Sequence, residues 1–72
     1  MRRRSLESSV LASAAYDPER RILELEFTSG DLYRYWIVPA RVWNELLDAD
    51  SKGQYFASHI RDRFPTERVD PP

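Results

Sequence analysis

The string Ser51-Lys52-Gly53 is the most unusual local feature of this 72-residue sequence. Ser51 followed three residues later by Gln54 matches a capping box, which starts a helix. The first amides of a helix lack partners within the helix, and glycine has no side chain to shield them. Because Lys52 adds a positive charge, the string predicts either a phosphate or carboxylate site or an ordinary capped turn. It lacks the spacing of a P-loop, so nucleotide hydrolysis is not indicated.

Two tyrosines, Tyr33 and Tyr35, flank Arg34 in a run of alternating side chains. Aromatic side chains on a sheet stack against unstacked bases in several RNA-binding folds, and each stacked base contributes about 1–3 kcal/mol. The alternative is that both tyrosines pack beneath helices, with their hydroxyls bonded at the edge of the core. Arg34 would then point to the opposite face, beside Glu24 and Glu26, where mixed charge disfavours phosphate.

Arg61 is the last candidate binding residue, and it follows Lys52 by two to three helical turns. Its long side chain would extend a basic patch around Lys52 toward a second phosphate. Arg63 and Arg68 would continue this strip, but acidic residues interrupt it. The alternative is that these cations complement the dipole at a helix end.

Catalytic and metal-binding chemistry finds little support in the sequence. His59 is the only histidine and there is no cysteine, which excludes a disulfide framework, a thiolate zinc site and a cysteine nucleophile. The serines have no recognisable base and orienting group near them, and a catalytic triad needs all three roles. We therefore expect no enzyme activity, no catalytic residues, no metal site and no cofactor.

The charge distribution separates the N-terminus from the rest of the chain. The formal net charge is −1, and Arg2, Arg3 and Arg4 leave 8 basic and 12 acidic residues in the remainder. A mildly acidic domain disfavours a dedicated duplex-DNA binder. No apolar run approaches the length of about 18 residues that a transmembrane helix needs, and no export signal is visible. We expect a cytoplasmic protein with no membrane partner.

Residues 9–16 alternate with a period of two and lead into the turn Tyr16-Asp17-Pro18-Glu19. Proline fixes φ for a type I turn, and aspartate bonds its own downstream backbone. Although alanine also favours helix, these signals predict a strand. Its alternation places Val10 on the face of Ala14 and Tyr16, with Leu11 on the other.

Two further strands follow. Residues 23–27 alternate apolar side chains with glutamates, which predicts one buried face made of Leu23, Leu25 and Phe27. Residues 28–31 supply a hairpin turn in which Gly30 takes a positive φ cheaply. Residues 32–38 form the third strand, with Ile37 on the face of the two tyrosines.

Pro39 ends that strand and suits the first turn of a helix. Apolar side chains at helical spacing then predict one helix over residues 40–49 and another from the Ser51 cap to Phe64. The sequence thus predicts an α+β fold, a three-stranded antiparallel meander followed by two short helices packed on one face.

The sequence predicts that the chain is divided into three segments. Residues 1–8 are expected to form a flexible basic arm, residues 9–64 a single domain, and residues 65–72 an extended or disordered tail.

The order of these landmarks resembles that of the KTSC domain over residues 8–63. This module has about the same length and occurs in some lysyl-tRNA synthetases and as a stand-alone bacterial or phage protein. The resemblance is carried by Ser8-Ser9, Tyr16-Asp17-Pro18, Phe27-Thr28-Ser29-Gly30, Tyr33-Arg34-Tyr35, Val38-Pro39, Ser51-Lys52-Gly53-Gln54-Tyr55-Phe56 and Ile60-Arg61.

The resemblance implies a small non-enzymatic binding module, with RNA as the ligand that the synthetase context suggests. The alternative is a protein–protein adaptor or a homodimer that uses the exposed sheet face around Trp36. Clustering of Arg34, Lys52, Arg61 and Arg63 on one face would favour RNA. An apolar patch centred on Trp36 would favour a protein partner.

Overall fold

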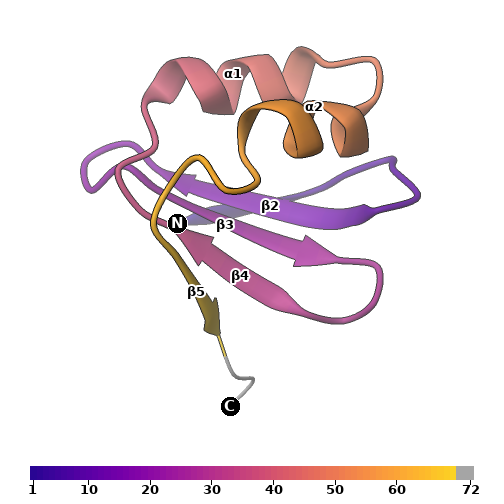
Figure 1. Ribbon diagram of the computed structural model, residues 1–72, viewed down its shortest axis with the longest axis horizontal. Helices are drawn as coiled ribbons and strands as arrows, with labels where there is room; N and C mark the ends of the chain where they lie inside the picture. The colour runs from indigo at the N-terminus through magenta and orange to yellow at the C-terminus, as the bar shows by residue number, and fades with distance from the viewer. Residues whose placement is uncertain (70–72) are drawn as a thin grey trace.

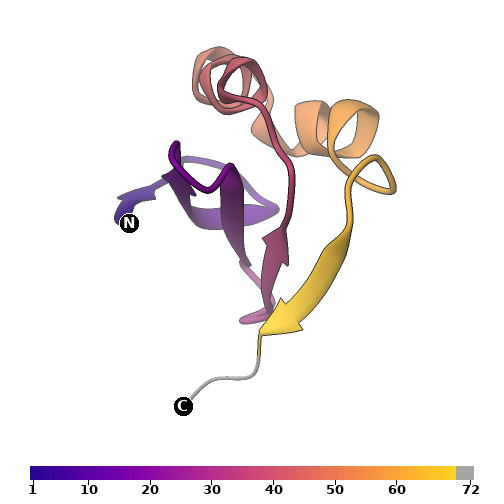
Figure 2. The same ribbon diagram turned by 90° about the vertical axis from the view of Figure 1, so that its left-hand side faces the viewer.

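The computed structural model describes residues 1–69, which form a five-stranded antiparallel sheet with two helices packed on one face (Figure 1). The strands follow one another across the sheet in sequence order. Viewed from the side, both helices lie over the same face and the sheet curves beneath them (Figure 2). The elements in chain order are β1 (Arg2–Ser5), β2 (Leu11–Asp17), β3 (Ile22–Phe27), β4 (Leu32–Tyr35), α1 (Ala40–Asp48), α2 (Lys52–His59) and β5 (Thr66–Val69).

The α+β class and the one-sided helix layer are as predicted, but the predicted number of three strands is wrong. The additional strands form in the segments expected as an arm and a tail: β1 pairs with β2, and β5 pairs with β4. Both segments are short, polar and at the edges of the sheet, so they lack the apolar alternation that reveals a strand. Residues 70–72 of the expected tail lie outside the described residues.

A β-bulge changes which side chains of β2 face the core. The register of β2 against β3 shifts between Leu11 and Ser13, because β2 has one residue more than β3 at this point. An extra residue in one strand reverses which side chains face the core on one side of the bulge. Leu11 is therefore fully buried, whereas Val10 is 40% exposed, the reverse of the predicted faces. Ala14 and Tyr16 lie downstream of the bulge and face the core as predicted.

The predicted register of β3 is confirmed. Leu23 and Leu25 are fully buried in the cluster beneath the helices, and Glu24 is on the opposite face. Phe27 packs against this cluster but is only partly buried; its ring meets the edge of Phe56 at a centroid distance of 5.2 Å.

The chain leaves β4 three residues earlier than predicted. Ile37 adopts a φ of 61°, which is uncommon for a β-branched residue, and the residue is 67% exposed. This turn lets Val38 enter the core, where its N–H donates to the Arg21 carbonyl at 2.9 Å. The expectation that Ile37 shares the face of the tyrosines is therefore wrong, because the backbone turns before it.

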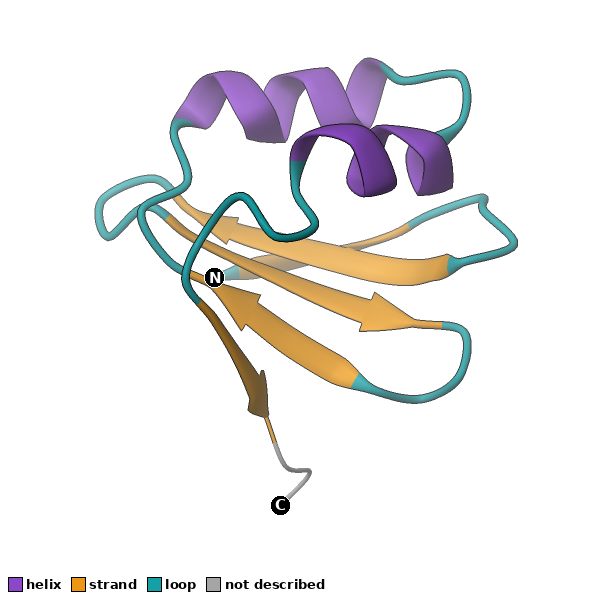
Figure 3. Cartoon of the chain, viewed as in Figure 1, coloured by secondary structure: helices purple, strands orange, loops and turns teal. Residues whose placement is uncertain are grey.

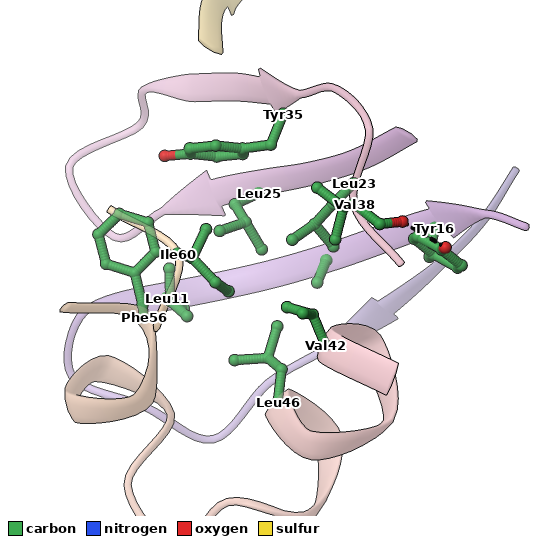
Figure 4. Packing of buried hydrophobic residues seen from close by; sticks show 11 residues of the cluster. Leu11, Tyr16, Leu23, Leu25, Tyr35, Val38, Val42, Leu46, Phe56 and Ile60 are labelled. Atoms are coloured by element: carbon green, nitrogen blue, oxygen red, sulfur yellow. Dashed lines mark hydrogen bonds between the residues drawn. The ribbon is translucent and has the colours of Figure 1, made fainter. Parts of the chain in front are cut away.

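Both helices begin where the sequence predicted. Ser51 caps α2, since its Oγ accepts a hydrogen bond from the Gln54 N–H at 3.3 Å. The helix ends at His59 rather than at Phe64, and Asp62 takes a φ of 61° just beyond it. Figure 4 shows the core, which the helices close against the sheet: Leu11, Ala14, Tyr16, Leu23, Leu25, Tyr35, Val38, Val42, Leu46, Phe56 and Ile60.

A row of charged side chains crosses the outer face of the sheet. In register, Arg3, Ala15, Glu24, Arg34 and Glu67 lie side by side across the five strands. The Glu24 carboxylate accepts hydrogen bonds from Arg3 and from Arg34, the latter at 3.0 Å, and Arg34 also lies 4.0 Å from Glu67. Ala15 is only 1% exposed although no helix covers it. Its small side chain leaves room for Arg3 to reach over it to Glu24.

The bulge in β2 makes a prediction that simple alternation would reverse. Leu11→Ala should lower the free energy of unfolding by about 2–5 kcal/mol, because it leaves a cavity in the core. Val10→Ala should cost less than about 1 kcal/mol, as expected of an exposed side chain. Urea denaturation of both variants measures the difference, and a larger loss in Val10→Ala would show that the bulge is misplaced.

The charged row predicts a link between β1 and the rest of the sheet. Glu24→Gln should lower the free energy of unfolding by about 1–2 kcal/mol, since it weakens hydrogen bonds to two partly exposed guanidiniums. Amide exchange in β1 should accelerate more than exchange in β3. Glu19→Gln, in the exposed turn after β2, is the control; unchanged exchange in β1 of Glu24→Gln would argue against the link.

Candidate functional site

Four of the seven predicted binding residues line one pocket, which we call the Lys52 pocket. It has a volume of about 540 Å³ and lies where the loop before β2 meets the start of α2. These two segments are at the same end of the molecule (Figure 3). The predicted residues in its wall are Ser51, Lys52, Gly53 and Arg61, and they are joined there by Ser8 and Ser9.

Gly53 allows the two walls of the Lys52 pocket to approach. A β-carbon at this position would lie 3.1 Å from Val10 Cγ2 and 3.9 Å from Ser8 Oγ. Ser8 Oγ accepts hydrogen bonds from the N–H groups of Val10 and Leu11, at 3.1 and 3.2 Å, which fixes the facing loop. The glycine therefore serves close packing: the Val10 side chain occupies the space beside it, and the Gln54 N–H of the same turn is bonded to Ser51 Oγ.

Lys52 has a structural partner that the sequence did not reveal. Its Nζ donates a hydrogen bond to the carbonyl of Ala49, the C-cap residue of α1, at 2.9 Å. A cation at this place is favourable for the C-terminal end of α1. The ammonium thus joins the ends of the two helices while it lines the pocket.

Arg61 also lines the pocket, with its guanidinium 5.5 Å from the centre of the Phe56 ring. This cation–π contact holds the side chain near the pocket. Glu7 and Asp50 also line the pocket, so its lining contains two cations and two carboxylates. Such a balance suits one phosphate at short range better than a broad polyanion surface.

The two tyrosines do not form an exposed stacking platform. They pair with Leu25 and Leu23 on the face that the helices cover. Tyr35 is only 4% exposed and belongs to the core, while Tyr33 is half-buried with its ring 5.7 Å from Phe27. Burial raises the pKa of Tyr35 to about 12. The packing alternative thus holds for Tyr35, which is not available to a base, whereas Tyr33 packs only partly against the core.

Arg34 lies on the other side of the sheet, away from the Lys52 pocket. Its guanidinium is bound to Glu24 and lies 5.9 Å from the centre of the Trp36 ring. The sheet therefore separates Arg34 from the Lys52 pocket, whereas Tyr33 and Tyr35 lie on the side of the helices, where Tyr35 packs against Phe56 with its ring centroid 6.0 Å away.

Ser8 and Ser9 are pocket residues that were not predicted as such. They were recognised as landmarks of the resemblance, but two polar residues before a strand carry no chemical signature of their own. They line the pocket because Gly53, far away in the sequence, has no side chain and lets their loop pack against the start of α2.

Metal and membrane chemistry receive no support from the part of the chain that the structure describes. Within residues 1–69, no group of three or more His, Cys, Asp or Glu residues is placed to hold a metal ion. Neither helix in this range is long and apolar enough to cross a membrane.

Comparison with known proteins decides the family. The family model of the KTSC domain matches residues 7–64. The chain belongs to the KTSC domain family. A crystal structure of a KTSC domain protein from Yersinia pestis has the same fold, with a TM-score of 0.93 and 33% sequence identity over 96% of this chain and 97% of that one. The match confirms the family resemblance that the sequence landmarks indicated.

Relatives of this KTSC domain are of two kinds. An uncharacterized protein of Stutzerimonas stutzeri is 57% identical over 78% of this chain and 79% of its own length. A lysine–tRNA ligase of a Nostoc species is 43% identical over 88% of this chain, which corresponds to 11% of the ligase. The domain thus occurs both as most of a small protein and as a small part of a large one.

The burial of Tyr35 makes alkaline stability a test of this arrangement. A pKa of about 12 in the folded state, against about 10 for an exposed tyrosine, means that folding favours the neutral phenol. The stability from this group is complete below pH 10 and is lost as the pH rises toward 12. Tyr35→Phe should therefore lose less thermal stability than the wild type over this interval.

Thermal unfolding at a series of pH values measures this loss, and Tyr33→Phe on the same strand is the control. An alkaline loss in Tyr35→Phe equal to that of the wild type would contradict the buried position of the hydroxyl.

Proposed function

We propose that this KTSC domain is a non-enzymatic module that binds RNA through phosphate contacts in the Lys52 pocket. The observation that carries the proposal is the convergence of Arg61 with Ser51-Lys52-Gly53 in one open pocket. Two cations beside the first amides of a helix suit a phosphate group, and the guanidinium of arginine matches phosphate geometry.

The choice of RNA among phosphate-bearing ligands is supported by the relatives. Segments of lysine–tRNA ligases from a Nostoc species, Nostoc punctiforme and Trichormus variabilis are 38–43% identical to this chain over 88% of its length. Because these relatives are parts of proteins named for tRNA, we propose RNA as the phosphate-bearing ligand. The mild acidity of the whole chain disfavours a strong, non-specific duplex binder.

The pocket also sets the expected strength of binding. Glu7 and Asp50 in its wall repel a polyanion, so we expect few phosphate contacts and therefore a shallow dependence of affinity on salt. The contacts come from Lys52 and Arg61, and each contact to single-stranded RNA adds about 0.7 to the slope of log K against log salt.

Neutralising these two cations tests the proposal. Arg61→Gln and Lys52→Gln should each weaken binding and lower the salt slope by about 0.7. The control Arg4→Gln removes one positive charge from β1, away from the pocket, and should change neither the affinity nor the salt slope. Fluorescence anisotropy with single-stranded RNA and with tRNA, at several salt concentrations, measures both. Lys52→Gln should also lose about 0.5–1.5 kcal/mol of stability, because it removes the bond to Ala49, whereas Arg61→Gln should keep most of it.

Equal binding by the wild type and Arg61→Gln would remove the Lys52 pocket as the RNA site. If the wild type binds no RNA at low salt, the adaptor hypothesis becomes the better one. In the structure, Trp36 is half-buried with the Arg34 guanidinium close to its ring. It therefore offers less apolar surface to a protein partner than the sequence predicted.

A further inference from the structure

A second pocket lies at the other end of α2, and we call it the His59 pocket. Its volume is about 390 Å³. The two helices run in opposite directions (Figure 1), so the start of α1 lies near the end of α2. The pocket lies between these two ends and is lined by Arg41, Val42, Tyr55, Ser58, His59, Arg63 and Phe64.

The lining of the His59 pocket is one-sided in charge. Arg41 comes from α1, His59 from the last turn of α2 and Arg63 from the segment after it. None of the lining residues is acidic, in contrast to the Lys52 pocket. Arg41 pairs with Glu45 on its own helix at 3.4 Å. Within residues 1–69, no ion pair with a carboxylate is formed by Arg63 or His59.

Arg41 is at an unfavourable place for a cation. It lies in the first turn of α1, where the helix dipole favours negative charge. This turn contains no acidic residue, and its N-cap, Pro39, provides no side-chain hydrogen bond. His59 at the end of α2 and Arg63 in the segment after it line the same pocket. Because Arg41 is already paired with Glu45, an anion in the pocket would chiefly neutralise Arg63 and would share the Arg41 guanidinium with Glu45.

The aromatic wall fixes the position of the imidazole. The Tyr55 and His59 rings are stacked, with their centroids 4.3 Å apart and their planes 12° from parallel. The Tyr55 hydroxyl donates to Glu45 Oε1 at 2.7 Å. Burial together with this bond raises the pKa of Tyr55 to about 12, and the same bond lowers the pKa of Glu45. A neutral phenol held by an ionised carboxylate thus orients the ring that supports His59.

We propose that the His59 pocket is a binding site for a phosphate oxyanion. The guanidiniums of Arg41 and Arg63, the imidazole of His59 and the hydroxyl of Ser58 are its donors. Planar guanidiniums bind phosphate in two-point contacts, and a hydroxyl adds a neutral donor. The site stands apart from the Lys52 pocket and does not depend on RNA binding there. Free phosphate and the backbone of a single-stranded RNA offer the same chemistry.

Nuclear magnetic resonance titration with inorganic phosphate tests this site directly. At constant ionic strength, phosphate should produce saturable shifts in the backbone amides of Ser58, His59 and Arg63. Arg63→Gln should weaken the affinity about tenfold, the effect of losing one charge-assisted contact. Arg63 and His59 are exposed, so Arg63→Gln and His59→Gln should keep the wild-type fold. Arg4→Gln is the control and should bind phosphate as the wild type does.

A titration with a short single-stranded RNA then identifies the source of the phosphate. Shifts of the same amides would assign the site to the RNA backbone, and unmoved amides alongside saturable phosphate binding would assign it to a small phosphate ligand. Shifts that do not saturate, or an equal loss of affinity in Arg63→Gln and Arg4→Gln, would overturn the proposal. Because Arg61→Gln tests the Lys52 pocket, failure at one site is distinguishable from failure at the other.

Discussion

The hydrogen-bonded row through Glu24 holds together a face of the sheet that no helix covers. All four residues of β1 are exposed, so this strand has no apolar side chain in the core to fasten it. Its backbone pairing with β2 is supported by Arg3, which reaches over Ala15 to the Glu24 carboxylate. Arg34 binds the same carboxylate from β4, so one side chain joins the first, third and fourth strands. Paired charged side chains thus stabilise the outer face of the sheet, while the apolar side chains pack on the other face, beneath the helices.

The one-sided helix layer also decides where binding can occur. The core is closed by two helices, and the shorter of them, α2, has eight residues. Each end of α2 leaves a space against a neighbouring segment. At the start of α2, the space is bounded by the loop before β2, which can pack closely because Gly53 has no side chain. At the end of α2, the space is bounded by the first turn of α1. Four basic residues of the second half of the chain are divided between these two spaces, Lys52 and Arg61 in one and Arg41 and Arg63 in the other, whereas Arg68 pairs with Asp31 on the sheet. They therefore do not form one linear basic strip.

Local signals in the sequence predicted those parts of the fold that depend on neighbouring residues. The Ser51 cap depends on Gln54 three residues away, and the register of Leu23 and Leu25 depends on strict alternation; both are confirmed. The bulge at Leu11 and the positive φ of Ile37 depend on the packing of distant segments, so alternation alone placed these side chains wrongly. The same holds for the sites. The sequence identified Lys52 and Arg61, but not the bond to Ala49, the apposition of Ser8 and Gly53, or the meeting of Arg41 with Arg63.

Electrostatics limit how these pockets can recognise a ligand. The chain has a net charge of −1, so long-range attraction of a polyanion is weak, unlike that of a strongly basic domain. Recognition must then come from short-range contacts with good geometry. The eight residues of α2 span roughly 12 Å at 1.5 Å per residue, and the pockets lie at its two ends. If both pockets bind phosphate as we propose, a single phosphate would occupy one of them, whereas a flexible strand with several phosphates would reach both. Two weak contacts joined by one ligand reinforce each other through effective concentration. An acidic domain with two separate phosphate pockets would therefore favour an extended single strand over either a compact anion or a rigid duplex.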